Sequence, residues 1–123
     1  MAYALRDSLE IFRNLGIKTN KVIASGGGAR SPLWLKIQAD IFNQEVYTTK
    51  MTEQACMGAA IMAGVGSGYY SSIQEACNQV VRYNSEPVLP DHNNAKIYDY
   101  YFEIYKELYE RNKDLFRKMT ISD

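Results

Sequence analysis

The sequence predicts an α/β fold that is rich in helices and has a narrow sheet. Two short β-branched segments, at 21–25 and 45–49, predict strands, and a less regular extended piece covers 80–83. Four or five segments with a helical spacing of apolar residues surround them. The chain has 123 residues, of which 46% are hydrophobic and 23% charged. This size and composition are typical of one globular domain, 1–123.

An amphipathic helix is predicted first, over residues 3–15. Leu5, Leu9 and Phe12 recur at three- and four-residue intervals among charged side chains. Gly16 follows the last apolar position and is suited to a helix C-cap, because glycine adopts the left-handed conformation at little cost.

A glycine turn follows the first strand. The three glycines at 26–28 lack a Cβ, so the backbone is free to take positive φ and a flat ligand can approach the main chain closely. Ser31 and Pro32 predict the cap and the first turn of a helix that continues to about Asn43. Trp34 lies on this helix, where it is expected to join the core or to wall a pocket.

The second strand, 45–49, is followed by a helix of small residues that begins at Thr52 and Glu53. Gly58 and Gly64 interrupt its alanine-rich pattern, and each glycine costs a helix about 1 kcal/mol relative to alanine. A neighbouring element or ligand is therefore expected to come close. We expect the helix to pack tightly behind the glycine turn and to end in the run of glycines that starts at Gly64.

The C-terminal half is predicted to be helical. Ser72 and Glu75 fit a capping box for a short helix at 72–79, and a turn-rich connection leads to a long helix over 91–118. Eight of the ten tyrosines lie at 69–109. The spacing of the aromatic side chains in the long helix predicts that this helix packs across the face of the domain.

The charge balance argues against nucleic acid and membranes as partners. Lysine plus arginine and aspartate plus glutamate each total 14, so the chain lacks an overall basic character. The N-terminus lacks a basic segment followed by an apolar one, and no apolar run approaches the ~20 residues of a membrane span. We therefore expect a cytoplasmic protein.

The few candidate metal ligands are poorly placed for a metal site. Cys56 and Cys77 are widely spaced and have no histidine nearby, so both are expected to be small apolar fillers. His92 is the single histidine, and its place between Asp91 and Asn93 predicts a solvated position at a helix start.

The glycine turn allows several interpretations. A Walker A loop is excluded, because no lysine follows a glycine cluster at the required spacing. In a dinucleotide fingerprint the third glycine would fall at Ser31, and the acidic residue near Glu53, which leaves a nicotinamide-dependent dehydrogenase as a weak alternative. A tight strand-to-helix connection that binds nothing is a further alternative.

Four blocks of the first 70 residues resemble the C-terminal part of the FGGY carbohydrate kinases, and within that family the xylulose kinases most closely. In order, they are Ala4-Leu5-Arg6-Asp7-Ser8-Leu9-Glu10, Gly26-Gly27-Gly28-Ala29-Arg30-Ser31-Pro32-Leu33-Trp34, Gln38-Ala39-Asp40-Ile41-Phe42-Asn43 and Glu53-Gln54-Ala55-Cys56-Met57-Gly58-Ala59-Ala60. The resemblance implies the C-terminal portion of a ribonuclease-H-like domain, the architecture shared with actin and Hsp70. Residues 1–70 would form a nucleotide-side α/β segment and 71–123 a helical closing segment.

The resemblance implies that the glycine turn is an adenosine-binding motif for ATP or ADP. The implied cofactor-binding residues are Gly26, Gly27, Gly28, Ala29, Arg30, Ser31 and Trp34. Backbone planes at the glycines would give the purine a flat surface, and Ala29 leaves room beside it. Arg30 either lies over a ring or points into water.

The same resemblance implies that catalytic residues are lacking in this chain. Phosphoryl transfer needs Mg²⁺, an orienting carboxylate and donors around the γ-phosphate, and the family's groups for these roles lie upstream of the matching region. Asp7, Asp40 and Glu53 are expected to be helix-surface, packing or helix-terminal charges rather than catalytic groups.

Two functional hypotheses follow. The first is the adenosine-binding portion of an ATP-dependent kinase for a ketopentose such as D-xylulose, not catalytically competent by itself. The second is a non-enzymatic interaction or structural module in which the turn binds nothing. An unprotected sheet edge and a bare apolar helix face predict association with the remainder of a kinase or with a second copy.

Overall fold

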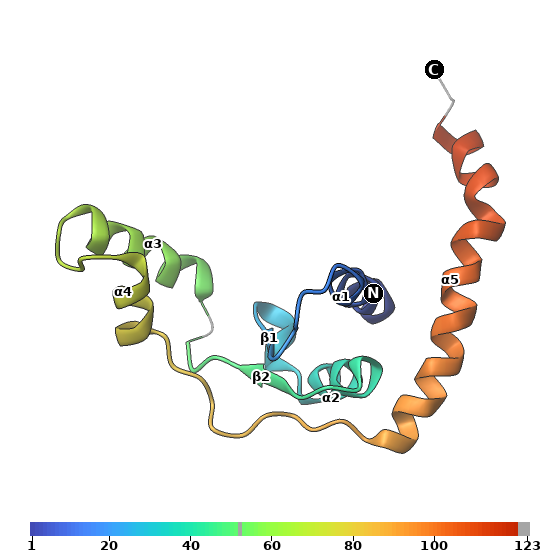
Figure 1. Ribbon diagram of the computed structural model, residues 1–123, viewed down its shortest axis with the longest axis horizontal. Helices are drawn as coiled ribbons and strands as arrows, with labels where there is room; N and C mark the ends of the chain where they lie inside the picture. Colours follow the sequence, from blue (N-terminus) through green and yellow to red (C-terminus); the bar gives the residue numbers. More distant parts are fainter. Residues whose placement is uncertain (52, 121–123) are drawn as a thin grey trace.

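The computed structural model describes residues 1–51 and 53–120. Its elements in chain order are α1 (Ala2–Asn14), β1 (Val22–Ala24), the 3-10 turn η1 (Gly27–Arg30), α2 (Pro32–Phe42), β2 (Val46–Thr48), α3 (Gln54–Gly66), α4 (Ile73–Val80) and α5 (His92–Thr120) (Figure 1). The helix-rich α/β fold with a narrow sheet is confirmed. Thr52, predicted to begin α3, lies outside the described residues, and Glu53 directly precedes the helix.

The sheet consists of β1 and β2, which run parallel in the register Val22↔Val46, Ile23↔Tyr47 and Ala24↔Thr48. The segment before α5 covers the outer edge of β2 through antiparallel bridges from Tyr83 to Thr49 and from Val88 to Val46. The predicted extended piece at 80–83 is therefore wrong in its bounds, because α4 continues through Val80. In the described part of the chain no strand pairs with the other edge of β1, so only this edge fits the predicted open sheet edge.

The predicted helix ends are confirmed by their hydrogen bonds. Ser31 Oγ accepts a bond from the Trp34 amide at the start of α2, and Ser72 Oγ accepts one from the Glu75 amide at the start of α4. Gly16 ends α1 with a φ of +77° and donates its amide hydrogen to the Arg13 carbonyl. These local signals act within a few residues, which explains why the sequence predicts them well.

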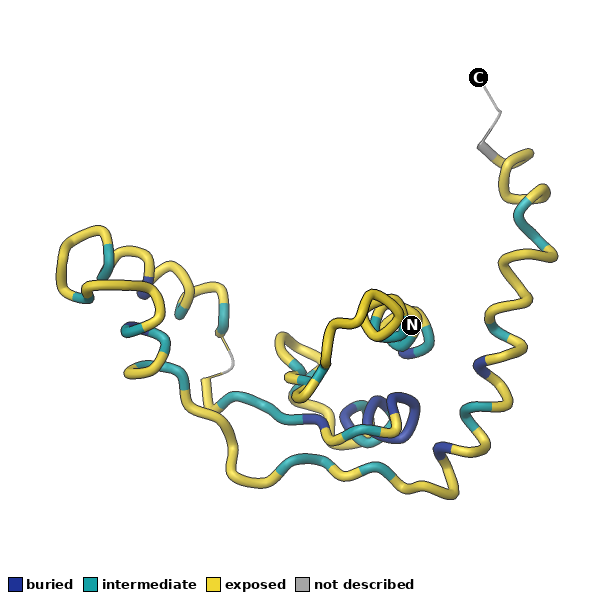
Figure 2. Tube along the Cα trace, viewed as in Figure 1, coloured by how far each residue is buried: buried dark blue, intermediate teal, exposed yellow. Residues whose placement is uncertain are grey.

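The core lies where α1 and the first half of α5 pack against α2. Figure 2 shows the buried residues gathered on α2, with isolated buried positions on α5. The main cluster consists of Ala2, Leu35, Ala39, Ile41, Phe42 and Val46. From α5, Ala95 and Phe102 are buried, and the Phe102 ring contacts the rings of Tyr3 and Tyr105. The Arg6 guanidinium lies 4.3 Å from the centroid of the Phe102 ring.

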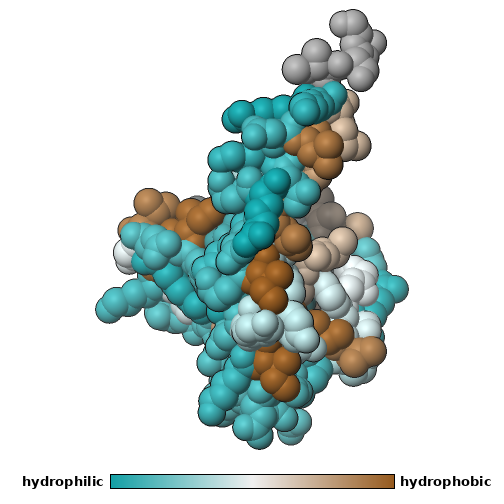
Figure 3. Space-filling view, turned by 90° about the vertical axis from the view of Figure 1, so that its right-hand side faces the viewer, coloured by the Kyte–Doolittle hydropathy of each residue, from teal (hydrophilic) through white to brown (hydrophobic). Residues whose placement is uncertain are grey.

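The prediction that the long helix packs across the face of the domain holds for the first half of α5 and is wrong for the second half. Tyr109 on the second half is 64% exposed, and Tyr100 and Tyr101 on the first half are also exposed, at 66% and 52%. Figure 3 looks onto α5 and shows hydrophobic side chains spaced along it among hydrophilic ones. Because α5 has 29 residues, it is about 43 Å long, and its second half extends beyond the other helices (Figure 1). Among the described helices, none combines the length and apolar character needed to cross a lipid bilayer.

The expectation that α3 packs behind the glycine turn is also wrong, because α3 packs mainly against α4. A Cβ at Gly58 would meet no heavy atom within 4 Å, so nothing approaches there. At Gly64, by contrast, the ring of Tyr70 would lie 2.7 Å from an added Cβ, and the predicted close approach occurs at that position. Cys56 is exposed rather than an apolar filler, whereas Cys77 is half-buried.

Asp40 joins α2 to the start of α5. Its buried carboxylate accepts hydrogen bonds from Lys36 Nζ at 2.7 Å, from the Asp91 amide at 2.6 Å and from Asn94 Nδ2 at 3.2 Å. Asp91 caps α5, because its Oδ1 accepts a hydrogen bond from the Asn93 amide. The side chain of His92 is exposed, and its Nδ1 lies 3.0 Å from Asn43 Oδ1. The expected packing role of Asp40 is therefore confirmed.

Candidate functional site

The glycine turn borders a small crevice at the carboxyl ends of β1 and β2. The crevice has a volume of about 170 Å³ and is lined by Ala24, Gly26, Ala29, Arg30, Thr48, Thr49, Lys50, Gln54 and Asn84. Because the strands are parallel, the loops that follow them emerge at the same end of the sheet, at the carboxyl ends of the strands. In open α/β sheets, ligands commonly bind at this end.

The backbone of the turn depends on one glycine in particular. Gly26 has a φ of +76°, in the left-handed region that a side chain disfavours. Gly27 and Gly28 are not in that region, and they form the first half of η1. Of the three glycines in the turn, Gly26 alone therefore adopts a positive φ.

Gln54, at the first position of α3, ties this turn to the loop after β2. Its Oε1 accepts a hydrogen bond from the Gly26 amide at 3.3 Å, and its Nε2 donates to Thr49 Oγ1 at 2.7 Å and to the Met51 carbonyl at 3.0 Å. Gln54 belongs to a block that resembles the kinases, but sequence reasoning gave it no role. Its partners are 3, 5 and 28 positions away, and no local pattern reveals the most distant of them, Gly26.

Replacing Gln54 with alanine is expected to lower the free energy of unfolding by about 1 kcal/mol, because three hydrogen bonds at a half-buried side chain are lost. The Gly26 amide is also expected to exchange its hydrogen with solvent faster. Gln54→Glu is the matched control, because it keeps the acceptor for Gly26 while it removes the donor to Thr49. Equal Gly26 exchange rates in both variants and the wild type would contradict this role.

Arg30, which lines the crevice, forms an ion pair with Glu53, with Arg30 Nη2 2.8 Å from Glu53 Oε1. Their side chains are 63% and 66% exposed, so solvent screens the pair and it contributes little to stability. Arg30 was expected to lie over a ring or to point into water, and in the structure its side chain is largely exposed and pairs with Glu53. Glu53 is the residue directly before α3, as expected for a charge at a helix start.

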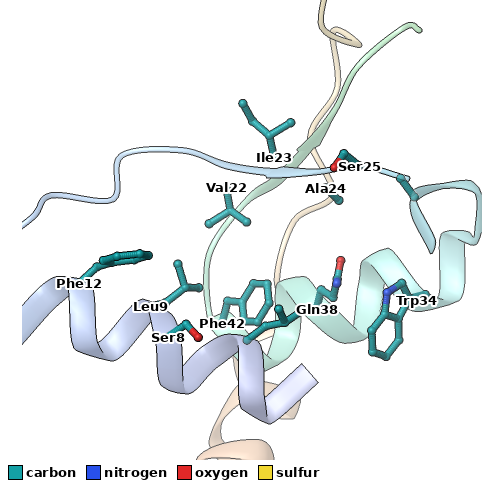
Figure 4. A pocket seen from close by; sticks show the side chains of 12 residues that line it. Ser8, Leu9, Phe12, Val22, Ile23, Ala24, Ser25, Trp34, Gln38 and Phe42 are labelled. Carbon is teal, nitrogen blue, oxygen red and sulfur yellow. The ribbon is translucent and has the colours of Figure 1, made fainter. Parts of the chain in front are cut away.

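Trp34 does not line this crevice. It lines a second cavity of about 330 Å³ between α1, α2 and β1, shown in Figure 4 together with Phe12, Val22 and Gln38. An added Cβ on Gly28 would lie 3.0 Å from the Trp34 ring, so this ring covers the bare side of Gly28. A Cβ on Gly27 would meet nothing within 4 Å.

The seven predicted site residues do not all lie at the crevice, and Gly27, Gly28 and Ser31 line neither of the two cavities. Gly26, Ala29 and Arg30 line the crevice, and Ala29 also borders the second cavity with Trp34. Ser31 serves as the cap of α2. Sequence reasoning missed the other crevice residues, namely Ala24, Thr48, Thr49, Lys50, Gln54 and Asn84.

The lining of the crevice is largely polar and includes two cationic side chains, Arg30 and Lys50. It offers hydroxyl groups from Thr48 and Thr49 and the amide of Asn84, whose Nδ2 donates to Thr48 Oγ1 at 2.7 Å. The volume of the crevice is below the ~300–1,000 Å³ typical of small-molecule pockets, so it is too small to enclose a whole nucleotide. In the described ranges, no group of three or more His, Cys, Asp or Glu side chains is placed to hold a metal ion.

Known proteins with similar sequences are carbohydrate kinases. Residues 1–67 match the model of the FGGY family of carbohydrate kinases, C-terminal domain. A xylulose kinase of Bacillus subtilis is 36% identical over 115 residues, which are 94% of this chain and 23% of that protein. A glycerol kinase of Saccharolobus islandicus is 38% identical over 79 residues, 63% of this chain and 16% of that protein.

Solved structures of xylulose kinases have a fold similar to that of this chain. The xylulose kinase from Rhodospirillum rubrum superposes with a TM-score of 0.74 at 28% identity, over 94% of this chain and 23% of that one. The ligand-bound xylulose kinase from Lactobacillus acidophilus superposes with a TM-score of 0.76, over 97% and 24%, and at 20% identity this likeness concerns the fold alone. The chain thus spans about a quarter of the length of these proteins.

Proposed function

Since this chain belongs to the FGGY family of carbohydrate kinases, we propose that it is the adenosine-binding portion of an ATP-dependent sugar kinase. The sugar we propose is a ketopentose such as D-xylulose, because several of the similar proteins are xylulose kinases. The observation that carries the proposal is the crevice between the glycine turn and the carboxyl ends of two parallel strands.

In this proposal the crevice holds the adenosine of ATP or ADP. Gly26 and Ala29 present backbone and a single methyl group, which leave room for a planar base. Thr48, Thr49 and Asn84 offer hydrogen-bonding groups to the base or the ribose. Recognition then depends mainly on shape and on backbone contact, with Arg30 at the rim.

The phosphates and the sugar would be bound by other parts of the kinase. Phosphoryl transfer requires Mg²⁺, an orienting carboxylate and donors around the γ-phosphate. The crevice residues include no carboxylate, so we propose that Mg²⁺ is held through the phosphates and through groups outside this quarter of the protein. The isolated chain is therefore expected to give no ATP-dependent phosphorylation of D-xylulose, and turnover at an ordinary kinase rate would contradict this.

Calorimetry with ADP tests the adenosine site. We expect weak binding by the isolated chain, with a Kd of about 1 mM, since the phosphate contacts are missing. Ala29→Leu, which fills the crevice, is expected to weaken binding at least about fivefold. Ala60→Leu on the exposed surface of α3 is the matched control and should bind ADP like the wild type. Saturable binding of NADH without binding of ADP would instead support the dehydrogenase alternative.

A structural module is the second candidate function. Two observations favour it: the Trp34 ring covers the bare side of Gly28, and Gln54 already accepts the hydrogen bond of the Gly26 amide. The turn is then a tight connection that binds no ligand. Binding of neither ADP nor NADH, in the isolated chain or in a complex with the rest of a kinase, would favour this function over the first.

A further inference from the structure

Lys21, which directly precedes β1, places its ammonium group over two tyrosine rings. Lys21 Nζ lies 4.1 Å from the ring centroid of Tyr47, on β2, and 3.9 Å from that of Tyr83, in the segment before α5. A cation within about 6 Å of a ring centroid is attracted by the electrons of the aromatic face. These three residues, which we call the lysine clamp, therefore join three segments that are distant from one another in the sequence.

Tyr83 belongs to the short stretch of chain that brings Asn84 to the crevice. The Lys50 amide donates a hydrogen bond to the Arg82 carbonyl at 2.9 Å, and the Asn84 amide donates one to the Thr48 carbonyl at 2.9 Å. These two backbone bonds flank Tyr83. The Asn84 side chain lines the crevice, where its Nδ2 donates to Thr48 Oγ1. A shift of Tyr83 would therefore move a crevice residue directly.

The backbone bonds of this stretch need support from side chains. Residues 82–85 are all exposed, and hydrogen bonds at such a site open readily, because water replaces the lost partner. The lysine clamp adds a contact to the side chain of Tyr83, which is 41% exposed. The Tyr47 ring is in turn held at its far end, since its hydroxyl donates to Glu45 Oε2 at 2.7 Å. Lys21 thus links Tyr83 to a ring that is itself fixed.

We propose that Lys21 is a positioning residue for the crevice: by holding the Tyr83 ring beside β2, it keeps the Asn84 amide group where a ligand meets it. This rests on the proposed function, since Asn84 is one of the residues proposed to contact adenosine. Lys21 does not line the crevice, so its effect passes through Tyr83 and Asn84. In the described part of the chain, the bonds of the Asn84 side chain run from Nδ2, which leaves Oδ1 to accept one from a ligand.

Hydrogen exchange of the Asn84 and Lys50 amides, followed by NMR, tests the lysine clamp. Lys21→Met removes the charge and keeps the length of the side chain, and we expect both amides to exchange at least about fivefold faster, because two cation–π contacts are lost. Tyr83→Leu, which removes one ring, should act in the same direction, whereas Lys21→Arg keeps a cation and should preserve the wild-type rates. Lys18→Met is the matched control, because Lys18 is an exposed lysine of the same loop. Equal exchange rates in Lys21→Met and Lys18→Met overturn the proposal.

An NMR titration with ADP shows whether the lysine clamp acts on the site. Lys21→Met and Asn84→Ala are each expected to weaken ADP binding about threefold, and the double variant no more than Asn84→Ala by itself, because Lys21 acts through Asn84. Additive effects of the two substitutions, or faster amide exchange with unchanged ADP affinity, overturn the positioning role while the proposed function stands. Absence of ADP binding by the wild type rejects the proposed function and the positioning role with it, and the exchange rates then decide by themselves whether the clamp holds the segment.

Discussion

Replacing Asp40 with alanine is expected to lower the free energy of unfolding by about 3 kcal/mol. The carboxylate is buried, and it joins Lys36 to the Asp91 amide and Asn94 across the contact between α2 and α5. Removing one partner of a buried charged network leaves the others unpaired, which costs far more than the loss of an exposed pair. Urea unfolding followed by Trp34 fluorescence measures the effect.

The pH dependence of stability provides a second measure of the same carboxylate. Burial would raise the pKa of Asp40, but hydrogen bonds from the Asp91 amide, Lys36 and Asn94 outweigh it and hold the pKa below the ordinary 3.8. The stabilisation is therefore complete above the unfolded-state pKa and is lost as the pH falls through the lower folded-state pKa. Asp40→Asn is expected to remove this part of the acid sensitivity.

Asp7 on α1 supplies the control for both measurements. Its side chain is exposed, so Asp7→Ala should change the free energy of unfolding by no more than ~0.5 kcal/mol. If Asp40→Ala changed the free energy of unfolding as little as Asp7→Ala, the buried network would contribute nothing measurable to stability. The role that we assign to Asp40 would then be wrong.

Replacing Phe102 with alanine is expected to lower the free energy of unfolding by about 4 kcal/mol. Phe102 is fully buried, and its ring contacts Tyr3, Tyr105 and the Arg6 guanidinium. Truncation of a buried phenylalanine removes its burial and leaves a cavity. Since domains are stable by only ~5–15 kcal/mol, the loss is a large part of the total.

Two signals distinguish global unfolding from detachment of α5 after this substitution. Far-ultraviolet circular dichroism reports on all helices, whereas Trp34 fluorescence reports on the body around α2. Loss of helical signal with unchanged fluorescence would mean that α5 separates while the body stays folded. Ile97→Ala on the same helix is the control, because Ile97 is 57% exposed and its truncation should cost little. Equal effects of the two substitutions would contradict the packing described here.

The predictions that succeeded concern interactions between residues close in the chain. The caps at Ser31 and Ser72 and the helix end at Gly16 were predicted because each satisfies backbone groups within a few residues. The bounds of the segment near 80–83 were wrong, because its pairing joins Tyr83 to Thr49 and Val88 to Val46. Such distant pairs have no local signal.

The predictions for the candidate site divide in the same way: features set by neighbouring residues were predicted, and features set by distant residues were not. The glycine turn was visible in the sequence, and Gly26 indeed takes positive φ. The sequence did not reveal that Trp34 lies away from the crevice or that Gln54 holds the turn, because both facts depend on how α2 and α3 are oriented. The burial of α5 was overestimated for a related reason: spacing predicts an apolar face but not the length of the surface that covers it.

By itself, the sequence determined the helix-rich α/β class, the order of the elements, their caps and the resemblance to the FGGY kinases. These properties arise from backbone sterics, apolar periodicity and short motifs, all of which act locally. Only the tertiary structure decided which turn residues line the crevice, that Asp40 and Phe102 join α5 to the body, and that apolar side chains on the second half of α5, such as Leu108 and Leu115, stay exposed. Each of these depends on contacts between segments far apart in the chain, whose relative placement is set by packing.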